Sequence, residues 1–155
     1  MKIAVNRKLS VSRPSITSLV YVSTARPGLD QNDFQDIMTV AERNNQRLGI
    51  TGLVMFNGFN FMQCIEGERA VASDRLHRIG MDDRHTGLTI LSHHEIANRQ
   101  FAQWYMAGQY FPVKCGLPQS ELTEILSDNS VSENTRNLFQ SFRSLGARQA
   151  AHQVI

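Results

Sequence analysis

The first informative feature of this 155-residue sequence is what it lacks. It has only two cysteines, Cys64 and Cys115, and no CxxC pair, so neither a disulfide framework nor a zinc ribbon is indicated. No stretch approaches the ~20 apolar residues of a membrane span. Residues 1–15 contain basic residues but not the apolar run of a signal peptide. We therefore expect a cytoplasmic protein with reduced thiols and no membrane partner.

A charge excess of one sign is also missing. The net charge is +2, from 16 Lys and Arg against 14 Asp and Glu, and many basic residues lie beside acidic ones. A nucleic-acid-binding face needs clustered Lys and Arg, so nucleic acid is not indicated as a partner. The hydrophobic fraction of 41% is ordinary for a globular protein, and the length suits one compact domain with a modest tail.

Motifs for common enzyme chemistry are absent as well. There is no Walker-type phosphate loop and no dinucleotide-binding fingerprint. His93, His94 and Glu95 are adjacent, but neighbouring residues on an extended segment point to opposite faces, so we expect no metal site there. A Cys-His nucleophile pair using Cys64 has no support beyond composition, because a buried cysteine usually serves packing. The sequence therefore gives no reason to expect an enzyme.

What the sequence does contain is a regular alternation of strand and helix patterns. Apolar and β-branched runs bounded by turn residues predict strands at 16–23, 50–56, 59–66, 88–92 and 104–111. Apolar residues at helical spacing predict helices at 30–45 and 69–81. Asn57-Gly58 is a strong hairpin signal between the second and third strands. The order βαββαββ indicates an α+β, ferredoxin-like sheet with two helices on one face.

The same patterns divide the chain into three parts. Residues 1–15 are predicted to be an N-terminal lead-in, residues 16–111 the main domain, and residues 112–155 a C-terminal extension. The extension is predicted to hold two short helices, at 120–128 and 134–145, after a break that contains Pro112 and Pro118.

Two polar residues stand mid-strand among apolar neighbours. Strand alternation places Tyr21 on one face with Leu19, and Gln63 on one face with Ile65. A buried glutamine must find partners for both ends of its amide, or it costs ~1–3 kcal/mol. Taken alone, Tyr21 can be a core tyrosine with its hydroxyl at the surface, and Gln63 an outward-facing strand residue.

Two other pairs have ordinary structural explanations when they are taken alone. Asn44 and Asn45 end the first predicted helix, where asparagine often forms a C-cap. Trp104 and Met106 are expected to share a face of the fifth strand, where both are most simply core residues.

The segment from Ser18 to about Tyr110 resembles the BLUF domain, a flavin-binding blue-light sensor module. Five stretches carry the resemblance, in matching order and spacing: LVYVS, the Asn-Asn pair leading into GITGLVMF, FMQCIEGE, MDDRHTGL and FAQWYMAG. The lead-in and the two C-terminal helices lie outside it.

The resemblance implies that a ferredoxin-like sheet holds a flavin ring between its two helices. FAD is the cofactor usual in the family, with FMN and riboflavin as alternatives. The roles that the resemblance implies fall on the redox tyrosine Tyr21, the switch glutamine Gln63, the ring-anchoring Asn45 with Asn44 beside it, the Arg84-His85 pair near the other ring edge, and the signalling residues Trp104 and Met106. Ile37 and Ile79 are our own prediction for ring-packing residues, from helix faces alone.

The implied function is blue-light reception. Excited flavin takes an electron and a proton from Tyr21, and Gln63 then rotates or tautomerises, so that a donor reaches a flavin carbonyl and the absorption shifts to the red. No output domain is recognisable, so we expect action on a separate protein or through a homo-oligomer. The alternatives are a flavin-binding oxidoreductase on the same fold and an interaction domain that has lost its cofactor.

Overall fold

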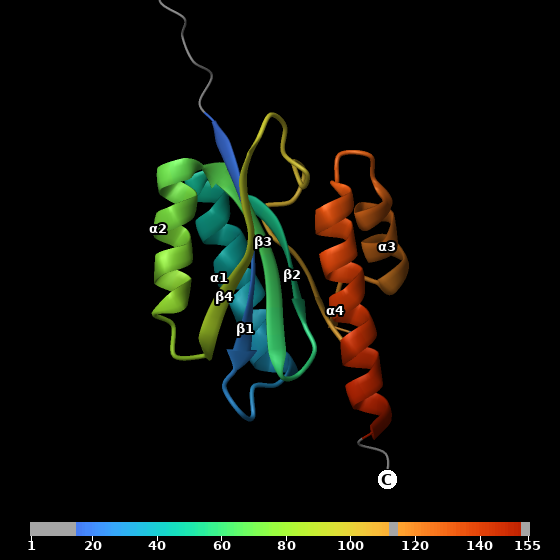
Figure 1. Cartoon of the computed structure of the whole chain (residues 1–155). Coiled ribbons are helices and arrows are strands. Elements are labelled where there is room, and N and C mark those ends of the chain that lie inside the picture. Colours follow the sequence, from blue (N-terminus) through green and yellow to red (C-terminus); the bar gives the residue numbers. More distant parts are fainter. Residues whose placement is uncertain (1–14, 112–114, 153–155) are drawn as a thin grey trace, which may run out of the picture.

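A computed structural model describes residues 15–111 and 115–152 (Figure 1). Its strands are β1 (Ile16–Ala25), β2 (Thr51–Phe56), β3 (Asn60–Glu68), β4 (His85–Ile96), β5 (Ala107–Tyr110) and β6 (Cys115–Gly116). Its helices are α1 (Gln31–Leu48), α2 (Arg69–Gly80), α3 (Gln119–Ser127) and α4 (Glu133–His152). Apart from Ser15, the predicted lead-in lies outside the described residues.

The strands form one sheet in the order β4-β1-β3-β2-β5-β6. Neighbouring strands are antiparallel except β2 and β5, which run parallel. The order of elements from β1 to β5 is βαββαββ, so the predicted α+β, ferredoxin-like architecture is confirmed. The short strand β6 extends the sheet by one strand that the sequence did not indicate.

The ends of α1 explain why it begins and stops where it does. Asp30 caps the first turn, because its side chain accepts hydrogen bonds from the backbone N–H groups of Asn32 and Asp33. Asp33 in turn accepts from the backbone N–H of Asp30, which completes a capping box. Gly49 ends the helix at φ 65°, in the left-handed region that favours glycine.

Two of the predicted strands have different bounds in the structure. The strand predicted at 88–92 is the middle of the 12-residue β4. Its ends lack an apolar alternation because β4 is an edge strand, and most of its side chains are at least partly exposed. The strand predicted at 104–111 is shorter, because the chain turns just before Ala107, and the backbone N–H of Trp104 bonds to the carbonyl of Phe101 at 3.1 Å.

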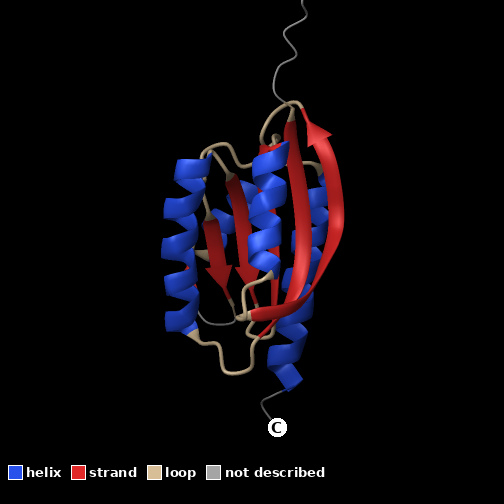
Figure 2. Cartoon of the chain, turned by 90° about the vertical axis from the view of Figure 1, so that its left-hand side faces the viewer, coloured by secondary structure: helices blue, strands red, loops and turns tan. Residues whose placement is uncertain are grey.

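Helices cover both faces of the sheet. In Figure 1, α1 and α2 lie on one side of the sheet and α3 and α4 on the other. Figure 2 shows α1 and α2 side by side in front of the strands. This arrangement matches the predicted two helices on one face. It also places the C-terminal helices against the opposite face, which the sequence patterns did not specify.

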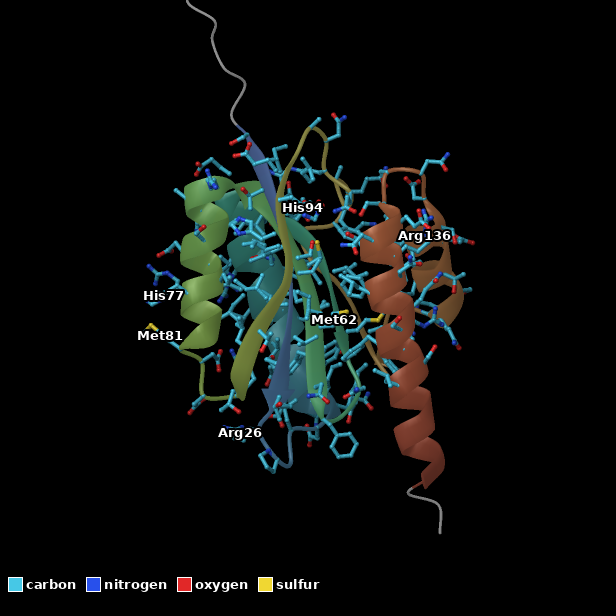
Figure 3. All side chains as sticks on the ribbon, viewed as in Figure 1. Arg26, Met62, His77, Met81, His94 and Arg136 are labelled. Carbon is cyan, nitrogen blue, oxygen red and sulfur yellow. The ribbon has the colours of Figure 1, made fainter. Side chains whose placement is uncertain are left out.

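The sheet shares a continuous apolar core with the C-terminal helices. Strand residues such as Val20, Met55 and Met62 pack in one cluster with Leu122 of α3 and Phe139 of α4. Figure 3 shows Met62 between the sheet and α4. The boundary predicted at residue 112 therefore does not separate two independent cores.

A buried polar network also ties β3 to the loop between α3 and α4. Glu66 is fully buried, and its carboxylate accepts hydrogen bonds from the backbone N–H groups of Gln100 and Phe101. Burial raises the pKa of Glu66, although these donors oppose the rise. The side-chain carbonyl of Gln100 accepts from the backbone N–H of Ser132 at 2.8 Å. The end of β3 is thus linked through Gln100 to the start of α4.

Candidate functional site

A cavity lies between α1, α2 and the sheet. Its volume is about 230 Å³, somewhat below the ~300 Å³ at which small-molecule pockets typically begin. The lining residues come from both helices, from β1 to β4 and from the segment before β5. They are Tyr21, Ile37, Val40, Ala41, Asn44, Val54, Phe61, Gln63, Arg75, Arg78, Ile79, Asp82, Arg84, His85 and Met106.

A chain of hydrogen bonds crosses the sheet side of this cavity. Tyr21 and Gln63 are direct partners in the antiparallel register of β1 and β3, so their side chains emerge next to each other on one face. The hydroxyl of Tyr21 donates to Oε1 of Gln63. The Nε2 group of Gln63 donates to Sδ of Met106 at 3.5 Å. Both ends of the buried amide therefore have partners.

Burial sets the protonation state of the tyrosine. Tyr21 is only 2% exposed, and burial raises the pKa of its hydroxyl well above the ordinary value. The positive charge of Arg75 opposes this rise, and the negative charge of Asp82 adds to it. Tyr21 is therefore a neutral phenol near pH 7 and acts as a hydrogen-bond donor.

Arg84 and His85 line the cavity from neighbouring positions in the chain. Arg84 donates from Nε to Asp82 at 2.9 Å, and this contact lowers the pKa of Asp82 to about 2. His85 forms a 2.7 Å hydrogen bond between Nδ1 and the Ser23 hydroxyl. Burial lowers the pKa of His85, so its ring is mostly neutral near pH 7. The ring lies 6.5 Å from that of Tyr21, centroid to centroid.

The two adjacent asparagines of α1 have different surroundings. Asn44 lines the cavity, whereas the side chain of Asn45 is fully buried. The Nδ2 group of Asn45 donates to the carbonyl of Tyr105 at 2.9 Å, just before Met106. Its Oδ1 atom is buried and has no hydrogen-bond partner among the described residues. Asn45 thus has one acceptor available to a ligand or water that reaches it.

Trp104 does not join the cavity residues. It packs against the apolar cluster on the α3 and α4 face, while Met106 is buried with Phe61 and Val54 on the α1 face. The expectation that Trp104 and Met106 share a face of the fifth strand is wrong. Both residues precede β5, and the turn before it breaks the alternation that a continuous strand would have given.

The family resemblance and the helix faces together predicted eight of the lining residues and missed several charged ones. Ile37, Asn44, Ile79, Arg84 and His85 line the cavity, as do the three residues of the hydrogen-bond chain. The missed charged residues are Arg75, Arg78 and Asp82. Helical spacing was a usable signal for one of them, because Arg75 stands four residues before Ile79 on α2.

Neither a metal-binding cluster nor a membrane-spanning helix occurs among the residues that the structure describes. Within residues 15–111 and 115–152, no three His, Cys, Asp or Glu side chains are grouped so that they could hold a metal ion. Among the helices of that same part of the chain, none is long and apolar enough to cross a bilayer.

The structure thus combines a ferredoxin-like sheet with a cavity beneath its two helices, lined by apolar and polar side chains. The family model for BLUF, described as sensors of blue light using FAD, matches residues 16–107. The chain therefore belongs to the BLUF family. Its fold and its place in that family make it a flavin-type blue-light sensor domain.

Curated relatives match about half of the chain. Subunit beta of the photoactivated adenylate cyclase of Euglena longa is 31% identical over 91 residues, which are 58% of this chain and 11% of that protein. The blue light- and temperature-regulated antirepressor BluF of Escherichia coli is 29% identical over 76 residues, 49% of this chain and 19% of that protein. The matched segment is thus a small share of each relative.

Solved structures agree with the family. The dark-state structure of the BLUF protein BlrB has a TM-score of 0.60 at 33% identity, and the match covers 63% of this chain and 74% of that one. Klebsiella pneumoniae BlrP1, in a calcium and cy-diGMP complex, has a TM-score of 0.73 at 29% identity, covering 86% of this chain and 35% of that one.

Proposed function

We propose that this chain senses blue light through Tyr21 and Gln63, with a flavin in the cavity beside them. The observation that carries the proposal is the hydrogen-bond chain from Tyr21 through Gln63 to Met106, all three lining one cavity. It places a phenol against an amide whose two ends differ in hydrogen-bonding character.

The residues in and next to the cavity suit a flavin ring. Ile37 of α1 and Ile79 of α2 offer apolar surface from the two helices that flank the cavity. The unpartnered Oδ1 of Asn45 suits a ring N–H donor, because a buried acceptor without a donor is costly. Arg84 and Asn44 add polar side chains that suit the carbonyl groups at the edge of the flavin ring. We take FAD as the cofactor from the family's description, with FMN and riboflavin as alternatives.

The flavin, Tyr21 and Gln63 have different roles in the proposed photochemistry. The flavin supplies light absorption and, when excited, a strong pull on electrons. With a flavin bound, Tyr21 would give an electron to the excited ring and its hydroxyl proton to Oε1 of Gln63, where the hydrogen bond already points. Once the electron and the proton had returned to Tyr21, Gln63 would be left rotated or tautomerised, because its amide can present a donor on either side.

We propose a sensor rather than an oxidoreductase, because the carboxylate and the imidazole that line the cavity are already engaged. Asp82 is held by Arg84 through three hydrogen bonds from the guanidinium, and His85 is bonded to Ser23. Neither group stands as a free acid or base beside the Tyr21–Gln63 pair.

Output is proposed to leave the cavity through Met106. A change at the Gln63 amide alters its bond to Met106, and the next residue, Ala107, packs in the cluster that holds α3 and α4. A two-state rearrangement at this point would reach the C-terminal helices on the other face of the sheet. The receiver is proposed to be a separate protein or a second copy of this chain.

Met106→Ala is expected to keep the red shift and to weaken its transmission to the C-terminal helices. Alanine removes the sulfur that accepts from Gln63 and leaves Tyr21 and the flavin contacts in place. Hydrogen exchange of α3 and α4 should change on illumination in the wild type and about severalfold less in the variant. An unchanged light effect in Met106→Ala removes this residue from the pathway. Met62→Ala, on the opposite face, tests whether truncating any core methionine has the same effect.

The proposal as a whole is tested with Gln63→Leu, which keeps the size of the side chain and removes the amide. This variant should bind flavin and show no red shift under blue light. A normal red shift in Gln63→Leu would contradict the switch role.

A further inference from the structure

Arg75 is the arginine of the cavity wall that has no carboxylate partner among the described residues. Arg78 forms an ion pair with Asp74 at 2.8 Å, and Arg84 forms one with Asp82. Arg75 enters none of the ion pairs found in that part of the chain. Its Nε atom is buried and has no hydrogen-bond acceptor there. Arg75 is therefore the guanidinium of the cavity wall without an ion pair among the described residues, and Asp82 acts on it only from a distance.

The position of this charge is close to the photochemical pair. Arg75 lies one helical turn before Ile79 on α2, and both line the cavity. The positive charge of Arg75 opposes the rise in the pKa of Tyr21, so the guanidinium acts on the tyrosine hydroxyl across the cavity that both residues line. Burial lowers the pKa of Arg75, but a guanidinium starts so high that it stays charged near neutral pH.

A cation in a partly desolvated site favours negative charge that develops near it, because Coulomb interactions strengthen as the effective dielectric falls. Reduction adds electrons to the ring of a flavin. We propose that the charge of Arg75 favours the reduced state of a flavin bound beside Tyr21, and that Arg75 thereby tunes how readily the ring accepts an electron in this cavity. The inference rests on the proposed function, since it requires a flavin at this site.

A flavin nucleotide offers a second anion, its phosphate. The position of Arg75 favours the ring, because Arg75 lines the same cavity as Tyr21 and Gln63, which are proposed to face the ring. A phosphate partner would make Arg75 distinguish FAD from riboflavin and would leave the redox equilibrium of the ring unchanged. An experiment can therefore distinguish whether Arg75 acts on the flavin ring or on the phosphate.

The test is a spectroelectrochemical titration of the full chain, loaded in turn with riboflavin and with FAD. The electrode supplies two electrons, and water supplies the protons that the reduced ring takes up. With both flavins, Arg75→Gln is expected to move the equilibrium about tenfold toward the oxidised form, which is about 30 mV for a two-electron couple. Arg75→Met should do the same, and Arg75→Lys, which keeps the charge, should retain most of the wild-type potential.

Arg69→Gln is the matched control. Arg69 lies on the same helix but is exposed, pairs with Glu95 at 3.6 Å and does not line the cavity. Its removal changes the net charge equally and should leave the potential unchanged. If Arg69→Gln lowers the potential as much as Arg75→Gln does, the effect belongs to net charge and the proposal is overturned.

Two other results would also overturn it. One is a wild-type potential in both Arg75→Gln and Arg75→Met. The other is weaker binding of FAD, but not of riboflavin, at an unchanged potential, which assigns Arg75 to the phosphate. A wild-type chain that binds neither flavin is a separate outcome: the proposed function then fails, and this inference fails with it.

Discussion

Tyr21→Phe is expected to abolish the light-induced red shift of the flavin and to leave the flavin bound. Phenylalanine fills the same buried position, so the packing of β1 is kept, but it lacks the hydroxyl that donates to Gln63. Loss of that bond leaves the buried Oε1 of Gln63 without its donor and costs stability by ~1–3 kcal/mol. Without the phenol, no proton is delivered to the amide, and Gln63 keeps its dark arrangement. The measurement is a light-minus-dark absorption spectrum, with flavin content determined on the denatured sample.

Tyr110→Phe is the matched control for this prediction. Tyr110 is also buried, on the same side of the sheet, but packs against Phe34 and Phe56 and does not line the cavity. It should keep a normal red shift. A normal shift in Tyr21→Phe would refute the role assigned to this tyrosine, whatever the control shows.

Phe139→Ala is expected to lower the free energy of unfolding by about 3–5 kcal/mol. Phe139 of α4 is fully buried, with its ring 6.5 Å from that of Phe101 in an edge-on arrangement. Truncation leaves a cavity between α4 and the sheet, because neighbours on two different elements cannot both collapse into it. Urea denaturation followed by circular dichroism measures the change.

The same helix supplies a control for the stability prediction. Leu145 is 58% exposed, so Leu145→Ala should change stability by less than ~0.5 kcal/mol. Because the sheet and the C-terminal helices share one core, Phe139→Ala should shift a single unfolding transition that also releases flavin. Melting of α3 and α4 alone, with the flavin still bound, would show that these helices fold separately from the sensor.

The central pair of the site could be predicted from sequence because it sits in regular strands. Alternation fixes the face of Tyr21 on β1 and of Gln63 on β3 once each strand is identified. What alternation cannot supply is the register that makes them direct partners. Register depends on the hairpin and on packing across the whole sheet. The pairing of Tyr21 with Gln63 could therefore be predicted only from the family resemblance.

The errors fall where local rules stop applying. Trp104 and Met106 were assigned to a strand, but the turn before Ala107 sends them to opposite faces. The roles of Asn44 and Asn45 toward a flavin stay predictions: the two lie about 100° apart around α1, and the sequence does not give the helix rotation by which Asn44 lines the cavity and Asn45 is buried.

Arg75 and the placement of the C-terminal helices needed the three-dimensional structure. On a helical pattern Arg75 is an ordinary charged residue, and its burial depends on how α2 lies over β1. The apolar stripes of α3 and α4 show that these helices pack on something, but both faces of the sheet were candidates until the structure placed them. Tertiary packing decided both features.

The most direct test is the light-minus-dark absorption spectrum of the purified wild-type chain. A protein that senses blue light through Tyr21 and Gln63 should carry flavin absorption that moves slightly to the red under blue light and returns in the dark. A chain that takes up no flavin, or a flavin-loaded chain whose spectrum blue light leaves unchanged, would contradict the proposed function.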